Sequence, residues 1–333
     1  MSYETILQEL KKRKYKPVYW LEGEEDFFID QLSSYIENNV LSEAEKGFNL
    51  TVFYGKDANW SEVVNACRRY PMFAELQVVM LKEAQVMKDL EKLEIYIEKP
   101  LNSTLLVVAH KQGKLDGRTR LARLVKEKGE VLSTRKLYDN QLPEWVVNYT
   151  AEKGFSIAEK ACLLLVDHIG NDLSRMVNEI DKLLLNIRDK KNIDDRDIEK
   201  YVGISREYNV FELQAALGKK DMAKAMKIVQ YFAANPKAAP IQMVLPALYA
   251  FFQKVYLVFG ANTRNEREVA AFLGLKNSFF VKDYLSAARN FGLEGAERAI
   301  LLLHQYNLRS IGINDAGYED GELLKEMVFK MIS

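Results

Sequence analysis

The chain has 333 residues, of which 48% are hydrophobic, with 47 acidic and 47 basic side chains. This length predicts two or three domains, and the zero net charge excludes the general basic field of a protein that binds nucleic acid tightly by itself. The two cysteines lie in apolar helical patterns and indicate buried reduced thiols, and none of the three histidines has a partner at metal-ligand spacing, so we expect no metal site.

The first predicted elements outline the site of a nucleotide-binding fold. Residues 17–22 form a short apolar strand, Gly23 follows as a turn, and three carboxylates at residues 24–26 start a helix. ATP-binding folds hold phosphate at such a strand, glycine turn and helix N-terminus. The sequence lacks the further glycines and the Gly-Lys-Ser/Thr of a phosphate loop, and the three carboxylates would repel a triphosphate. We therefore expect a scaffold of this type with no bound cofactor.

Alternating strands and helices continue to about residue 140. Apolar runs predict the other four strands at Asn49–Tyr54, Gln77–Lys82, Thr104–Ala109 and Glu130–Ser133. Helical patterns lie between the strands, at about Glu25–Val40, Ser61–Tyr70, Gln85–Glu98 and Gly117–Lys128. This order predicts a parallel five-stranded sheet with crossover helices, which is the nucleotide-binding α/β architecture.

A second requirement of an ATPase is also missing. An apolar strand should end in an acidic residue that holds Mg²⁺, but the strand at residues 78–81 runs into Lys82. His110, after the fourth strand, is a polar group in the position of a γ-phosphate sensor, which by itself is weak support. The sequence therefore predicts a protein that binds partners and does not turn over a substrate.

Two large apolar residues stand in a connection between a helix and a strand. Pro71 ends the predicted helix Ser61–Tyr70, and Met72 and Phe73 follow before the third strand. Connections run over the surface, so one reading is an exposed plug for another protein's pocket, in which each side chain would contribute about 1.5–3 kcal/mol. The other reading is that both side chains fold back onto the sheet as core.

After residue 137 the strand signals stop and helical patterns remain. A small helical domain is expected at 141–207, and helices with a period near 3.6 fill the rest of the chain from 208. The longest apolar stretch, Val244–Phe252, contains Pro246 and is too short to span a bilayer. With a charged N-terminal helix and no signal-peptide pattern, we expect a cytoplasmic protein with no membrane contact.

Several motifs in this order resemble the delta-subunit family of the bacterial DNA polymerase III clamp loaders. The resemblance runs nearly end to end and rests on Tyr19–Glu25, Pro71–Phe73, Lys114–Asp116, Gly170–Leu173, Glu179–Leu183, Val210–Leu213, Ala270–Leu275 and Phe280–Lys282. It implies an AAA+-like parallel five-stranded sheet module (1–140) without ATPase activity, a small helical lid (141–207) and a C-terminal helical collar (208–333). The collar would join the other clamp-loader subunits in a five-subunit ring.

The resemblance also implies a function and its residues. The first domain's tip would bind the sliding clamp (the beta subunit) and open it for loading onto primed DNA, with Met72 and Phe73 as the wedge and Tyr70 beside them. Phosphate contacts are possible at three basic residues near the start of the fourth crossover helix, Arg118, Arg120 and Arg123. A solvated helix face is the ordinary alternative there. Two rival functions are an active AAA+ ATPase and a helical adaptor unrelated to replication.

Overall fold

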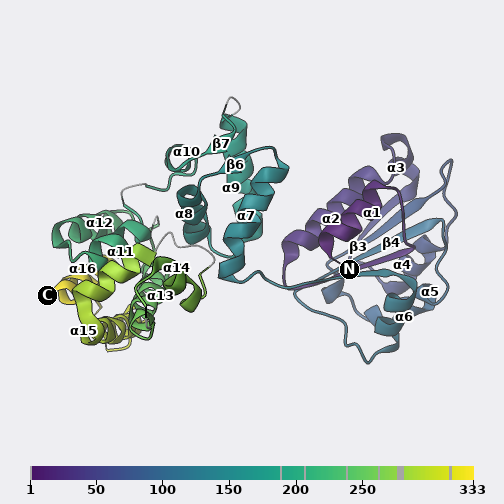
Figure 1. The fold of residues 1–333 in the computed structure, drawn as a ribbon. Coiled ribbons are helices and arrows are strands. Elements are labelled where there is room, and N and C mark those ends of the chain that lie inside the picture. The colour runs from purple at the N-terminus through teal and green to yellow at the C-terminus, as the bar shows by residue number, and fades with distance from the viewer. Residues whose placement is uncertain are drawn as a thin grey trace. The chain divides into compact units, whose positions relative to one another are not determined.

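The structure is a computed structural model that describes residues 2–187, 190–205, 208–237, 239–261, 263–275, 281–314 and 317–333. The chain divides into two compact units, residues 1–142 and 143–333 (Figure 1). Of the motifs that carry the resemblance, Phe280 lies outside the described residues.

A five-stranded sheet forms the centre of the first unit. Its strands are β1 (Val18–Gly23), β2 (Leu50–Tyr54), β3 (Gln77–Lys82), β4 (Thr104–Lys111) and β5 (Glu130–Thr134). Their order is β2-β3-β4-β1-β5, and every neighbouring pair is parallel. The predicted α/β fold class is confirmed. Strands β1, β3 and β4 are almost wholly buried, which explains their continuous apolar sequence.

Helices cover both faces of this sheet (Figure 1). On one face, α1 (Tyr3–Lys11) and α2 (Asp26–Asn39) supply Ile6, Leu10, Ile29 and Leu32 to a buried cluster. The opposite face is covered by α4 (Trp60–Cys67), α5 (Glu94–Ile97) and α6 (Arg120–Lys128). A further helix, α3 (Glu43–Asn49), precedes the edge strand β2. Both faces of the sheet are therefore buried against helices, and each face forms part of an apolar core.

Two helix predictions in this unit need correction. The helix expected at 61–70 ends at Cys67, because side chains from the sheet bind the carbonyl groups at its C-terminus. The helix expected at 85–98 is wrong: two 3₁₀ turns, Ala84–Val86 and Leu90–Leu93, precede the short α5. Asp89 lies between the turns with a left-handed φ of 56°, a conformation that interrupts an α-helix.

The second unit is mainly helical. Around one apolar cluster lie α7 (Leu142–Glu152), α8 (Glu159–Ile169), α9 (Leu173–Asn186) and α10 (Asp195–Tyr201). No strand was expected after residue 137, but the structure has a short parallel pair there. Ser156–Ile157 (β6) pairs with Asn192–Ile193 (β7). Around another cluster lie α11 (Val210–Gly218), α12 (Met222–Ala234), α13 (Ile241–Val258), α14 (Glu266–Phe272), α15 (Val281–Ser310) and α16 (Asp320–Ile332). Gly292, with φ of 69°, marks a kink within α15.

Helix α13 lies in the helical region expected from residue 208 and extends beyond the apolar stretch Val244–Phe252, which was expected to be too short to span a bilayer. The helix continues through Pro246 for 18 residues, and among the described residues it is the one helix that is long and apolar enough to cross a membrane, by length and composition only. Leu245 and Leu248 beside the proline are buried in the core cluster. We infer that this packing offsets the hydrogen bond that the proline cannot donate.

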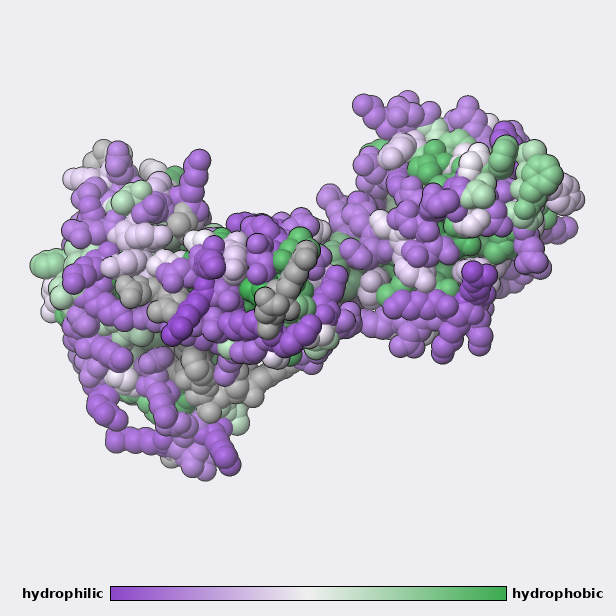
Figure 2. Space-filling view, turned by 90° about the horizontal axis from the view of Figure 1, so that it is seen from above, coloured by the Kyte–Doolittle hydropathy of each residue, from purple (hydrophilic) through white to green (hydrophobic). Residues whose placement is uncertain are grey.

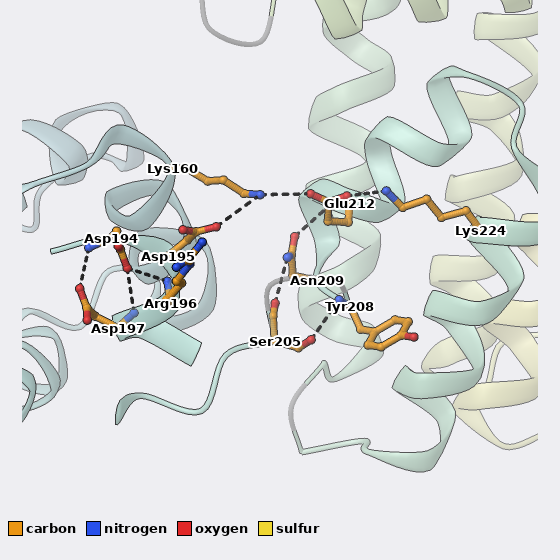
Figure 3. Close-up of polar contacts among 10 residues, drawn as sticks. All are labelled: Lys160, Asp194, Asp195, Arg196, Asp197, Ser205, Tyr208, Asn209, Glu212 and Lys224. Carbon is orange, nitrogen blue, oxygen red and sulfur yellow. Dashed lines mark hydrogen bonds and ion pairs between the residues drawn. The ribbon is translucent and has the colours of Figure 1, made fainter. Parts of the chain in front are cut away.

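One carboxylate connects helices from both apolar clusters of the second unit (Figure 3). Glu212 of α11 lies 2.6 Å from the Lys224 ammonium of α12 and 3.4 Å from that of Lys160 in α8. Lys160 also lies 3.8 Å from Asp195 of α10. The side chain of Asn209 accepts a hydrogen bond from the Glu212 backbone N–H at 3.0 Å and caps α11. These ion pairs therefore link helices of the two apolar clusters, in addition to the covalent link of the backbone between them.

Candidate protein-binding site

The connection between α4 and β3, residues 68–76, is here called the tip. Its large side chains are exposed: Phe73 retains 92% of its accessible surface, Tyr70 83% and Met72 52%. These values place Met72 and Phe73 at the surface and not in the core of the sheet. Figure 2 shows hydrophobic residues in green among mainly hydrophilic ones on the face that it displays. Exposed aromatic and thioether side chains together are typical of a site that binds another protein.

Buried polar side chains at the end of the sheet hold the base of the tip. Gln77, the first residue of β3, donates from Nε2 to the carbonyl oxygen of Arg69 at 2.6 Å and to Thr104 Oγ1 at 2.8 Å. Thr104 in turn donates to the carbonyl oxygen of Cys67 at 3.0 Å. These bonds satisfy carbonyl groups that the end of α4 leaves without helical partners. They fix where the helix stops and where the tip begins.

A second anchor reaches the tip from α3. The backbone N–H of Met72 donates to Asn49 Oδ1 at 2.7 Å, and Asn49 Nδ2 donates back to the Met72 carbonyl oxygen at 2.9 Å. We call this pair of bonds the Asn49 bracket. Phe73, the next residue, has a left-handed φ of 54°, which costs a residue with a Cβ about 1–2 kcal/mol. Two hydrogen bonds with a net value of about 0.5–1.5 kcal/mol each are large enough to offset that strain.

Sequence reasoning missed both Asn49 and its helix. Asn49 was expected to start a strand, but it is the last residue of α3 and only 2% exposed. A sequence signal was present, since Ser42 and Glu45 form the Ser-x-x-Glu pattern of a capping box. The Ser42 N–H donates to Glu45 Oε2 at 2.8 Å. The preceding Phe48 is 66% exposed, so α3 also presents an aromatic side chain at this end of the sheet.

The position where a nucleotide fold would hold phosphate is filled by the chain itself. Gly23 has φ of 130°, and a Cβ built on it would lie 2.2 Å from the carbonyl oxygen of Thr134. The N–H of Glu24 donates to that carbonyl at 3.4 Å, and the N–H of Glu25 donates to Thr134 Oγ1 at 3.2 Å. The Glu25 side chain accepts from the N–H of Phe27 at 3.2 Å. Backbone donors that would face a phosphate are therefore engaged within the protein.

The other positions of an ATPase site are also occupied by internal contacts. Lys82, at the end of β3, forms an ion pair of 2.7 Å with Glu37 of α2. His110 stacks on Trp20 with 6.3 Å between ring centroids. Across the described part of the chain, no group of three or more His, Cys, Asp or Glu side chains could hold a metal ion. The side chains of Lys82 and His110 therefore both have partners within the protein, and Glu37 neutralises the charge of Lys82.

The three arginines suggested for DNA contact lie at the start of α6 and are exposed. Arg118 pairs with Asp116 at 2.9 Å, and the hydrogen bonds from Arg118 hold the pKa of that carboxyl below its usual value. Arg120 lies 2.8 Å from Glu98 and 3.5 Å from Glu94. A phosphate would have to compete with these carboxylates. Of the three, Arg123 is the one for which the structure gives no side-chain ion pair.

Comparisons with known proteins show which proteins the chain is similar to. A family model described as "DNA polymerase III, delta subunit" matches residues 19–135. The chain is 25% identical to DNA polymerase III subunit delta of Bacillus subtilis (strain 168) over 337 aligned residues, which cover 97% of this chain and 94% of that protein. The chain is similar to the delta subunits of DNA polymerase III. The resemblance predicted from the sequence is confirmed.

Two further relatives agree with this assignment. The chain is 23% identical to the probable DNA polymerase III subunit delta of Aquifex aeolicus (strain VF5), with 90% of this chain and 89% of that protein covered. The solved structure of the Bacillus subtilis DNA clamp loader delta protein superposes with a TM-score of 0.55 at 23% identity, and covers 99% of each chain. At this identity the structural likeness supports the fold, which is that of a clamp-loader delta protein.

Proposed function

We propose that the chain is a non-catalytic clamp-loader subunit that binds the sliding clamp through its tip and opens it for loading onto primed DNA. The observation that carries this proposal is the exposure of Phe73 and Met72 on a connection held by buried hydrogen bonds. Burial of these two side chains in a partner would contribute about 3–6 kcal/mol in total. That range corresponds to a factor of roughly 10² to 10⁴ in affinity.

The opening step follows from differential binding. A clamp is a closed ring that can open at an interface between its subunits, and a ligand shifts such an equilibrium only if it binds the open form better. A wedge formed by Met72 and Phe73 next to an interface would supply this difference, with Tyr70 in the neighbouring contact. ATP would act on other subunits of the loader, by exposing or covering the tip.

The absence of catalysis is part of the same proposal. Its support is local: Thr134 engages the backbone donors after β1, and Lys82 with its partner Glu37 stands where Mg²⁺ would need a carboxylate. Neither arrangement leaves a place for a nucleotide phosphate or its metal ion. The subunit would contribute to the polymerase holoenzyme by binding, and we expect no cofactor.

The remaining assignments extend this role to the rest of the chain. We propose three domains, at 1–140, 141–207 and 208–333, because each range contains its own apolar cluster. The last domain would join the other clamp-loader subunits in the cytoplasm. DNA would be met within the assembled complex, where Arg123 is better available than the paired Arg118 and Arg120.

The test is the binding of purified chain to the sliding clamp from the same source. Met72→Ser combined with Phe73→Ser should weaken binding roughly 100-fold or more, because the buried apolar surface is lost. The matched control is Leu185→Ser combined with Phe329→Ser, which removes two exposed apolar side chains of the second unit, 67% and 58% exposed. Clamp binding by the tip variant that equals the wild type would show that the tip is not the binding site.

A further inference from the structure

The Asn49 bracket joins a buried amide to the middle of an exposed connection. Asn49 is 2% exposed, and its amide uses an acceptor and a donor on one residue, Met72. The same Nδ2 also donates to the carbonyl oxygen of Glu45 at 3.2 Å, one turn earlier in α3. The amide is therefore fixed to its own helix while it holds a residue 23 positions away in the sequence.

The bracket is the main polar restraint on the outer part of the tip. The hydrogen bonds of Gln77 reach the chain at Arg69 and earlier, before the exposed side chains. Within residues 70–76, all of which the structure describes, Met72 is the residue that makes hydrogen bonds, and both involve Asn49. The left-handed backbone of Phe73 comes directly after this point. Release of Met72 would let that backbone relax and turn the Phe73 ring to other directions.

We propose that Asn49 is a positioning residue for partner binding: it holds Met72 and Phe73 in the conformation that the clamp accepts, without touching the clamp itself. This inference rests on the proposed function of the tip. Its physical basis is preorganisation, because a connection that is already ordered loses less conformational freedom when it binds.

The kinetics of binding distinguish a positioning residue from a contact residue. If only a fraction of molecules holds the tip correctly, the apparent dissociation constant rises by the inverse of that fraction. A fall of this fraction to about one tenth raises the dissociation constant about tenfold, equivalent to about 1.4 kcal/mol. The change appears in the association rate, since the bound tip has the same contacts. Loss of a contact side chain instead raises the dissociation rate.

The experiment measures both rate constants for the full chain on immobilised sliding clamp. Asn49→Ala should lower the association rate about tenfold and leave the dissociation rate within about twofold. Asn49→Asp keeps an acceptor for the Met72 N–H but loses the donor to its carbonyl, so we expect an intermediate effect. Asn39→Ala is the control, because Asn39 Nδ2 donates to the carbonyl of Tyr35 at 2.9 Å at the exposed end of α2. Phe73→Ser should raise the dissociation rate.

The outcomes separate this inference from the proposed function. If Phe73→Ser weakens binding and Asn49→Ala changes no rate more than Asn39→Ala does, the positioning role is refuted and the tip remains the site. If Phe73→Ser has no effect, the proposed function fails and the inference fails with it. An increased dissociation rate in Asn49→Ala would also overturn the inference, because it indicates a lost contact.

A measurement on the wild-type protein makes the test independent of whether the variants fold. The Met72 N–H should exchange with solvent deuterium at least 100-fold more slowly than the neighbouring N–H groups of the tip, because it donates to a buried oxygen. Exchange of Met72 at the rate of Phe73 and Ala74 would mean that the bracket does not form in solution, and would refute the proposal. Slow exchange that becomes fast in Asn49→Ala, which removes the acceptor of the Met72 N–H, would support it.

Discussion

The hydrogen bonds of Gln77 give a direct test of how the tip is supported. Gln77→Met keeps an unbranched side chain of similar length and removes the amide donor. The variant loses two short bonds, to the Arg69 carbonyl at 2.6 Å and to Thr104 Oγ1 at 2.8 Å, each with a net value near 1 kcal/mol. The Arg69 carbonyl then lacks its partner in a partly buried site, which adds about 1–3 kcal/mol. We expect a total loss of about 3–5 kcal/mol in the free energy of unfolding.

The assay is urea denaturation followed by tryptophan fluorescence. The chain has three tryptophans, of which Trp20 and Trp60 lie in the first unit, so a Trp145→Phe background makes the signal specific to that unit. The midpoint should fall while the slope with denaturant stays constant. Gln8→Met, at an exposed position of α1, is the matched control. A loss below about 0.5 kcal/mol in Gln77→Met would refute the reasoning, because it would mean that water replaces the amide at little cost.

Two further predictions concern pH and ATP. Burial raises the pKa of Asp167 to about 6 from its ordinary value of 3.8. Between pH 3.8 and about pH 6 the folded state therefore binds more protons than the unfolded state. The stability of the folded state falls as the pH rises through this range. Asp167→Asn should be more stable than wild type by on the order of 3 kcal/mol at pH 7.5 and equal to it below about pH 4, and equal urea midpoints at pH 7.5 would contradict this. Saturating Mg²⁺-ATP should leave the melting temperature of the isolated chain unchanged, since a ligand stabilises only the state that it binds; a clear upward shift would favour the rival ATPase.

The bounds of an element were predicted best from the sequence where consecutive residues of a strand are all buried. The strand at Gln77–Lys82 was predicted with its exact bounds, because five of its six residues are buried and apolar or hydrogen-bonded. The helix expected at 85–98 failed because its apolar residues also suit two 3₁₀ turns, and nothing in the sequence announces the left-handed conformation of Asp89. Periodicity does not distinguish these cases when a segment is short.

The same limit applies to the candidate site. The local sequence after Pro71 left two readings of Met72 and Phe73 open, and the family resemblance favoured the exposed one, which the structure has. The two supports of the tip could not be predicted, because Gln77 reaches back to α4 and Asn49 reaches forward from α3. Such long-range polar contacts depend on the register of the sheet, and the sequence pattern alone does not give which side chains meet.

The closure of the turn after β1 by Thr134 has a consequence for any attempt to convert this protein into an ATPase. Introducing a glycine-rich loop with lysine and serine would not be enough, since the last residue of β5 already occupies the place. The conversion would also require moving that strand end and replacing Lys82. Under the proposed function, this subunit would keep one shape whether or not ATP is present, and in a ring of subunits that respond to nucleotide it would serve as the fixed reference against which they move.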